Sequence, residues 1–114
     1  EQDPWLAENP PDLEWWGGQF EPAEVPLESP IVEAVADAYR SVSRRDVVLE
    51  GMTYGADMRL LVNVAGIPTV MFGAGDVRQA HCPDEFVPLD ELQALAHTLC
   101  LTAIRFCGVV EDGD

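Results

Sequence analysis

The feature that most constrains the fold is the apolar run IPTVMF at residues 67–72, which lies between Gly66 and Gly73. A short apolar run without polar alternation is typical of a strand buried on both faces, as strands of parallel sheets usually are. The segment VVLEGM at residues 47–52 predicts a second strand. The aromatic stretch LEWWGGQF at residues 13–20 predicts a short or bulged edge strand.

Three helices are predicted to alternate with these strands. Ser29 and Pro30 open the first as N-cap and first helical residue. The second covers about residues 57–65 and ends at Gly66, and the third ends at Gly108. Apolar residues spaced by three and four mark inward faces: Val32, Val35, Tyr39 and Val42 in the first helix, and Leu92, Leu95, Leu99, Ala103 and Phe106 in the third. The order predicts an α/β fold with a mostly parallel sheet flanked by helices.

The charge balance restricts the partners. The 114 residues include 21 acidic side chains against six arginines and no lysine, which gives a formal net charge of −15. Such a surface repels phosphate backbones and anionic lipid, so we expect neither nucleic-acid binding nor a membrane role. No apolar run approaches the about 20 residues that span a bilayer, and the first residues lack a signal-peptide pattern, so we expect a cytoplasmic protein. Cys82, Cys100 and Cys107 have no zinc-knuckle or redox spacing and are expected to be free thiols.

Glycine and polar residues follow two of the predicted strands, at the sheet edge where ligands of open parallel sheets bind. The loop after residues 47–52 carries Gly55, Asp57 and Arg59, and the loop after residues 67–72 carries Gly73, Gly75 and His81. Arg59 either binds a substrate carboxylate by paired hydrogen bonds or pairs with Asp57 or Asp76. Asp84 and Glu85 either orient the His81 imidazole or form a polar turn ahead of the third helix.

The two histidines differ in their surroundings. His81 by itself fits a general base, a pH switch, a metal ligand or an ordinary surface residue. A metal site needs three or four ligands, and the other histidine, His97, lies in mid-helix off the apolar stripe, where we expect it to face solvent. Trp15 and Trp16 would point to opposite faces of the edge strand, and packing against a neighbouring sheet or domain is favoured over stacking on a ligand.

Four short motifs carry a resemblance to a known family. They are Gly-x-Asp-x-Arg at 55–59, Gly-Ile-Pro-Thr at 66–69, Phe-Gly-x-Gly at 72–75 and Ala-His-x-x-Asp-Glu at 80–85. With them, roughly residues 5–108 resemble the C-terminal part of the dinuclear zinc hydrolases that include acetylornithine deacetylase, succinyl-diaminopimelate desuccinylase, aminoacylase and glutamate carboxypeptidase. The last motif is the most specific of the four.

The resemblance implies a division of the chain and a set of roles. Residues 1–24 would be the end of a small lid or dimerisation domain and a linker, residues 25–110 the C-terminal part of a zinc-hydrolase catalytic domain, and residues 111–114 an acidic tail. A complete enzyme would hold two zinc ions, with cobalt or manganese as alternatives, and His81 would be a terminal ligand. The substrate pocket would be bordered by Gly55, Asp57, Arg59, Gly73 and Gly75, with Asp84 and Glu85 behind His81. Ala56 stands where many relatives have threonine or serine, so a hydroxyl toward the substrate is missing.

The resemblance implies no catalytic residue in this segment, because the bridging aspartate and the general-base glutamate belong to an N-terminal half of the enzyme. Two functions follow as hypotheses. The first is the C-terminal segment of a zinc-dependent amidohydrolase that cleaves the C–N bond of an N-acyl amino acid or peptide. This segment would be inactive alone and would act together with the remaining N-terminal part of the enzyme, as a monomer or homodimer. The second is an inactive fragment or degenerate relative that acts as an interaction module through the Trp15 and Trp16 edge.

Overall fold

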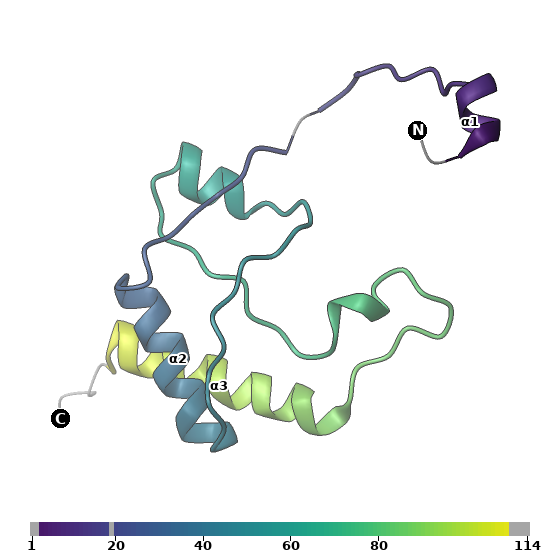
Figure 1. Ribbon diagram of the computed structural model, residues 1–114. Coiled ribbons are helices and arrows are strands. Elements are labelled where there is room, and N and C mark those ends of the chain that lie inside the picture. Colours follow the sequence, from purple (N-terminus) through teal and green to yellow (C-terminus); the bar gives the residue numbers. More distant parts are fainter. Residues whose placement is uncertain (1–2, 19, 110–114) are drawn as a thin grey trace, which may run out of the picture.

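The computed structural model describes residues 3–18 and 20–109. Its helices are α1 Pro4–Glu8, α2 Pro30–Ser43, η1 Leu60–Val64, η2 Val77–Gln79 and α3 Leu89–Cys107. Figure 1 shows α2 crossing α3, long loops reaching away from this pair, and the N-terminal segment with α1 far from both. The predicted acidic tail at residues 111–114 lies outside the described residues.

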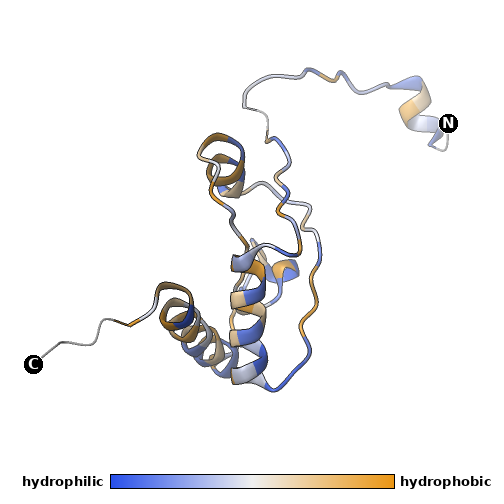
Figure 2. Ribbon diagram, turned by 90° about the vertical axis from the view of Figure 1, so that its left-hand side faces the viewer, coloured by the Kyte–Doolittle hydropathy of each residue, from blue (hydrophilic) through white to orange (hydrophobic). Residues whose placement is uncertain are grey.

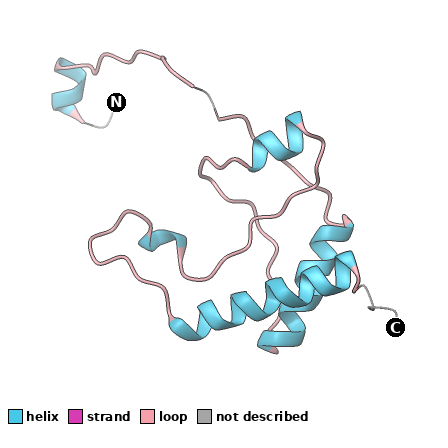
Figure 3. Cartoon of the chain, turned by 180° about the vertical axis from the view of Figure 1, so that it is seen from behind, coloured by secondary structure: helices cyan, strands magenta, loops and turns pink. Residues whose placement is uncertain are grey.

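The predicted α/β fold with a mostly parallel sheet is wrong for this structure. In the described ranges all regular structure is helical, and Figure 3 shows loops where strands were expected. A strand needs ladder hydrogen bonds to a neighbouring strand. Residues 47–52 and 67–72, and the described part of 13–20, have none, because the backbone hydrogen bonds outside the helices are local turns and caps. Ile67 is 52% exposed, so the apolar run at 67–72 is not buried on both faces.

Helix α2 forms as the local signals predicted. Ser29 is its N-cap and Pro30 its first residue, which suits a position whose N–H has no helical partner. Val32 is buried, as predicted, and Ala36 and Ala38 are buried beside it. Arg44 closes the helix with a φ of 59°, and its N–H donates to the Arg40 carbonyl.

Helix α3 packs through a different face from the one predicted. Thr98 is completely buried and Thr102 nearly so, whereas Leu92, Leu99 and Phe106 of the predicted inward stripe are about half exposed. Small side chains let two helices approach closely, and α2 therefore covers the threonine side of α3. This is the one pair of helices in contact in the described chain. The helix ends at Gly108 as predicted, with a φ of 79°.

The short apolar helix predicted near residues 57–65 is confirmed. It begins as α-helix at residues 58–59 and continues as the π-helix η1, and the Asp57 carbonyl accepts from the Leu60 N–H at 2.9 Å. Gly66 follows with a φ of 66°. Figure 2 shows strong hydrophobic colour over η1. Helix α1 was not predicted, although the Asp3 carboxylate caps it and Pro4 is its first residue.

The chain as a whole is open. Its radius of gyration is 20.0 Å, against about 13 Å for a compact domain of this length. Its accessible surface is 9976 Å², against about 6,200 Å² for a compact protein of this mass. Trp15 and Trp16 are 86% and 88% exposed, so neither packs against a neighbouring element. No helix in the described part of the chain is long and apolar enough to cross a membrane.

Candidate functional site

His81 lies in an exposed turn that follows η2. It has a φ of 63°, and Asp84 in the same turn has a φ of 60°, a backbone region that residues other than glycine seldom adopt. The His81 N–H donates to Glu85 Oε2 at 3.1 Å, and the Cys82 N–H donates to the Gln79 carbonyl at 3.0 Å. Glu85 thus holds the main chain of the turn, and His81 is exposed, with no hydrogen bond from its imidazole inside the described residues.

An ion pair stabilises η2, the helix that precedes this turn. The Asp76 carboxylate caps η2 by accepting from the Arg78 N–H at 2.9 Å, and it also accepts from Arg78 Nε and Nη2. The side-chain hydrogen bond from Arg78 is the main reason that the pKa of Asp76 falls from 3.8 to about 2, with smaller contributions from the backbone hydrogen bond and the charge. Asp76, one of the two carboxylates expected to pair with Arg59, is therefore bonded to Arg78.

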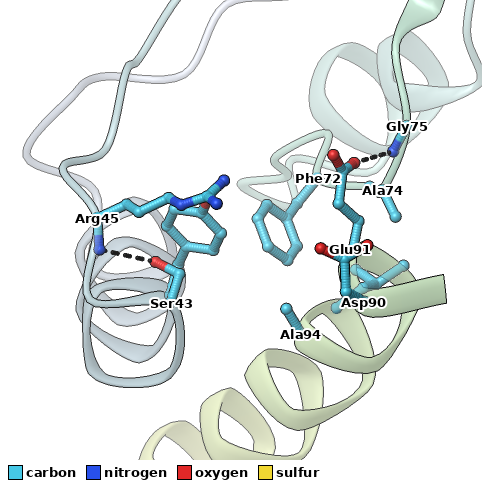
Figure 4. A pocket seen from close by; sticks show the side chains of 11 residues that line it. Ser43, Arg45, Phe72, Ala74, Gly75, Asp90, Glu91 and Ala94 are labelled. Atoms are coloured by element: carbon cyan, nitrogen blue, oxygen red, sulfur yellow. Dashed lines mark hydrogen bonds between the residues drawn. The ribbon is translucent and has the colours of Figure 1, made fainter. Parts of the chain in front are cut away.

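Gly73 and Gly75 line a cleft of about 340 Å³ between the C-terminal end of α2 and the first turns of α3. The Gly75 N–H donates to Glu91 Oε2 at 2.8 Å, which attaches the loop to α3. Gly75 has a φ of 85°, which favours glycine. Figure 4 shows Phe72 between the α2 side of the cleft and Glu91, and its ring meets the ring of Tyr39 edge to face at 5.7 Å.

Arg59 lies at the start of η1, where it contacts a ring from the N-terminal segment. Its Cζ atom lies 5.3 Å from the centroid of the Phe20 ring, within the range of a cation–π contact. Phe20 also lies against Gly55, and the Asn63 amide donates to the Pro22 carbonyl at 3.0 Å. Residues 20–22 are thus attached to the loop that carries Gly55, Asp57 and Arg59.

The two groups of predicted site residues do not meet in this structure. Figures 1 and 3 show the η1 segment, which follows Arg59, and the loop that contains His81 on different sides of the molecule. Convergence was predicted from two strands ending at one sheet edge, and the described part of the chain has no sheet to bring these loops together. His97 is exposed on α3, as predicted. Cys82, Cys100 and Cys107 are free and exposed.

Comparison with known proteins identifies the family. Residues 11–105 match the family described as peptidase family M20/M25/M40. The chain belongs to this family. The match confirms the resemblance to the zinc peptidases and deacylases that the four motifs predicted. No solved structure matches the chain.

Two curated relatives of this M20/M25/M40 chain have the same name, N-formyl-4-amino-5-aminomethyl-2-methylpyrimidine deformylase. The protein of Bacillus subtilis (strain 168) is 30% identical over 115 residues, which cover 94% of this chain and 27% of the relative. The protein of Halalkalibacterium halodurans is 28% identical over 113 residues, which cover 92% and 26%. The chain therefore spans about a quarter of the length of these relatives.

Whether this M20/M25/M40 segment can contribute to a metal site depends on His81. A zinc ion takes three or four protein ligands. Within residues 3–18 and 20–109 no three His, Cys, Asp or Glu side chains are grouped so as to hold a metal ion. An exposed histidine in a turn held by hydrogen bonds is suited to be one ligand of a larger site. His81 does not form a metal site by itself.

Sequence reasoning missed three residues that attach the two loops or η1 to other parts of the chain: Phe20, Asn63 and Glu91. Phe20 was assigned to an edge strand, whereas its ring lies on Gly55 and Arg59. Glu91 is one of several acids near the start of α3, and nothing in its spacing singles it out as the acceptor of the Gly75 N–H. Such contacts join residues far apart in the sequence, which periodicity and capping rules do not address.

Proposed function

We propose that this chain is the C-terminal part of a zinc-dependent amidohydrolase that cleaves the C–N bond of a small N-acyl compound. The family match over residues 11–105 supports a hydrolase of this class. Both curated relatives are deformylases of an N-formyl compound by name, and an N-formyl group on nitrogen is an amide. A small N-acyl amino acid or related amide is the proposed substrate class.

The observation that carries this proposal is the geometry of the His81 turn. The His81 N–H donates to Glu85 Oε2 at 3.1 Å, the residue is exposed, and within the described part of the chain its ring nitrogens form no hydrogen bond. His81 is the proposed terminal ligand to one of two zinc ions, with cobalt or manganese as alternatives, and Asp84 and Glu85 support the turn behind it. When bound, zinc supplies Lewis-acid polarisation of the scissile carbonyl and acidifies a water molecule.

The other ligands and the catalytic carboxylates would come from the remaining N-terminal part of the enzyme, which is the first partner proposed. The apolar side of α3 that α2 leaves open supports this, because Leu92, Leu99 and Phe106 are about half exposed there. An apolar stripe that stays exposed on a helix is typical of a surface that another part of the protein covers. A homodimer is a further proposed partner arrangement.

Gly55, Asp57, Arg59, Gly73 and Gly75 are the proposed border of the substrate pocket in the complete enzyme. Arg59 is the residue of this set that can bind an anion. Within the described residues it forms no ion pair, although the chain contains 21 acidic side chains. A guanidinium with unoccupied donors matches a planar carboxylate by paired hydrogen bonds.

The test compares two histidine variants of the complete enzyme. His81→Ala should lower kcat/KM for an N-formyl amine by more than about 100-fold, beyond the range of about 10–100-fold typical of changes behind a metal ligand. The matched variant His97→Ala should stay within about twofold, because His97 is an exposed residue of α3. Zinc content by atomic emission should fall only in His81→Ala. Equal losses in both variants, with unchanged folding, would refute the assignment.

A second function is favoured by the exposed aromatic residues of the N-terminal segment. Trp15 and Trp16 are 86% and 88% exposed, as in a surface that binds another protein. If the zinc-loaded protein hydrolyses none of an N-formyl, an N-acetyl and an N-succinyl amide, the interaction module replaces the hydrolase as the better account.

A further inference from the structure

Arg59 is held by an aromatic ring rather than by an acid. The Phe20 ring lies under the guanidinium at 5.3 Å from Cζ, and Arg59 Nε is buried without a hydrogen-bond partner among the described residues. A cation–π contact orients a guanidinium and leaves its charge and its outer N–H donors free. An acidic partner would instead neutralise the charge and occupy the donors.

Gly55 makes room for this ring. A Cβ atom at Gly55 would lie 2.8 Å from Phe20 Cδ1 and 2.9 Å from Phe20 Cγ, closer than real Cβ contacts. The φ of Gly55 lies outside the left-handed region, so the turn itself does not require glycine. The glycine of the Gly-x-Asp-x-Arg motif is therefore explained by the Phe20 ring.

A hydrogen bond secures the segment that carries the ring. The Asn63 amide donates to the Pro22 carbonyl at 3.0 Å, two residues beyond Phe20 and one helical turn beyond Arg59. The ring contact with Arg59 and this bond to Asn63 attach residues 20–22 to η1 and to the residue that precedes it. The orientation of Arg59 thus depends on a segment about forty residues earlier in the chain.

We propose that Phe20 is a positioning residue, which holds the Arg59 guanidinium in the orientation that binds a carboxylate of the substrate. The proposal rests on the proposed function, in which Arg59 borders the substrate pocket. Phe20 itself does not touch the substrate, and its effect passes through Arg59. Gly55 is part of the same arrangement, because a side chain at this position would displace the Phe20 ring.

The kinetic test uses the complete enzyme and two N-formyl amines, one with a carboxylate and one uncharged. Phe20→Leu should raise KM for the carboxylate substrate about tenfold with kcat unchanged, and leave KM for the uncharged one within about twofold. Gly55→Ala should also raise KM for the carboxylate substrate, because the added Cβ displaces the ring. Phe20→Tyr keeps the ring and should restore the low KM. Gly51→Ala is the matched control, since nothing lies within 4 Å of its added Cβ. Equal effects of Phe20→Leu on both substrates would overturn the proposal.

A double-mutant cycle separates positioning from a general structural role. In an Arg59→Met background, Phe20→Leu should cause no further rise in KM for the carboxylate substrate, because the ring acts through the guanidinium. A second rise of the same size would overturn the proposal.

A binding experiment decides the proposal even if the enzyme hydrolyses no amide, in which case only the proposed function fails. With arginine labelled at Nε, acetate should shift the Arg59 resonance saturably, and Phe20→Leu should weaken that binding about tenfold while Phe20→Tyr should not. Equal acetate affinity in all three proteins would overturn the positioning role.

Discussion

At the scale of single residues, the bidentate pair of Asp76 and Arg78 is a measurable feature of the turn that presents His81. Because hydrogen bonds from Arg78 lower the pKa of Asp76 from 3.8 to about 2, the pair stabilises the fold fully above pH 3.8. That stabilisation is lost as the pH falls from 3.8 toward 2, since the carboxylate becomes protonated.

We predict that the Asp76 side-chain carbon titrates near pH 2 in a carbon-detected NMR experiment, and that Arg78→Gln returns the midpoint toward 3.8. Arg105→Gln is the control, because Arg105 contacts Ser41 and not Asp76. A midpoint near 3.8 in the unaltered protein would show that the pair does not form.

At the scale of elements, α3 has two unlike faces, and the one against α2 contains two threonines in different states. Thr98 Oγ1 donates to the Ala94 carbonyl at 2.8 Å, whereas Thr102 Oγ1 is buried without a hydrogen-bond partner within the described residues. A buried hydroxyl without a partner costs about 1–3 kcal/mol, and a satisfied one costs little.

We predict that Thr102→Val stabilises the contact between α2 and α3 by about 1 kcal/mol, because valine removes the unpaired hydroxyl and keeps the branched shape. Native-state hydrogen exchange of the α3 amides measures this local stability, and exchange should slow about fivefold. The matched variant Thr98→Val removes a satisfied hydroxyl and should not slow exchange. Faster exchange in Thr102→Val would mean that the hydroxyl has a partner in solution.

At the scale of the whole molecule, the open shape predicts a large radius of gyration, and the single proposed metal ligand predicts weak zinc binding. Small-angle scattering of the isolated 114 residues should give a radius of gyration near 20 Å rather than about 13 Å. Calorimetry should find zinc binding weaker than micromolar, because His81 alone cannot supply the three or four ligands that zinc takes. A compact particle, or submicromolar zinc binding with a defined stoichiometry, would contradict the proposal that the rest of the site lies elsewhere.

Local signals predicted several elements correctly. Ser29, Pro30 and Gly108 marked two helix ends, and Gly66 marked the end of the helix before it, because caps and turns depend on the backbone preferences of a few neighbouring residues. The family followed from four short motifs for a similar reason, since each is a contiguous pattern. The amino-acid sequence was therefore enough to predict these features.

Which surfaces contact one another became visible in the folded chain alone. The run at 67–72 has the composition of a buried strand, yet burial and pairing need a neighbour that the described chain does not supply. The periodicity of α3 predicted an inward leucine stripe, whereas in the structure Thr98 and Thr102 are the buried residues against α2. Phe20 came to lie on Arg59 for the same reason: a contact between distant residues depends on how two separate surfaces fit, which no local pattern contains.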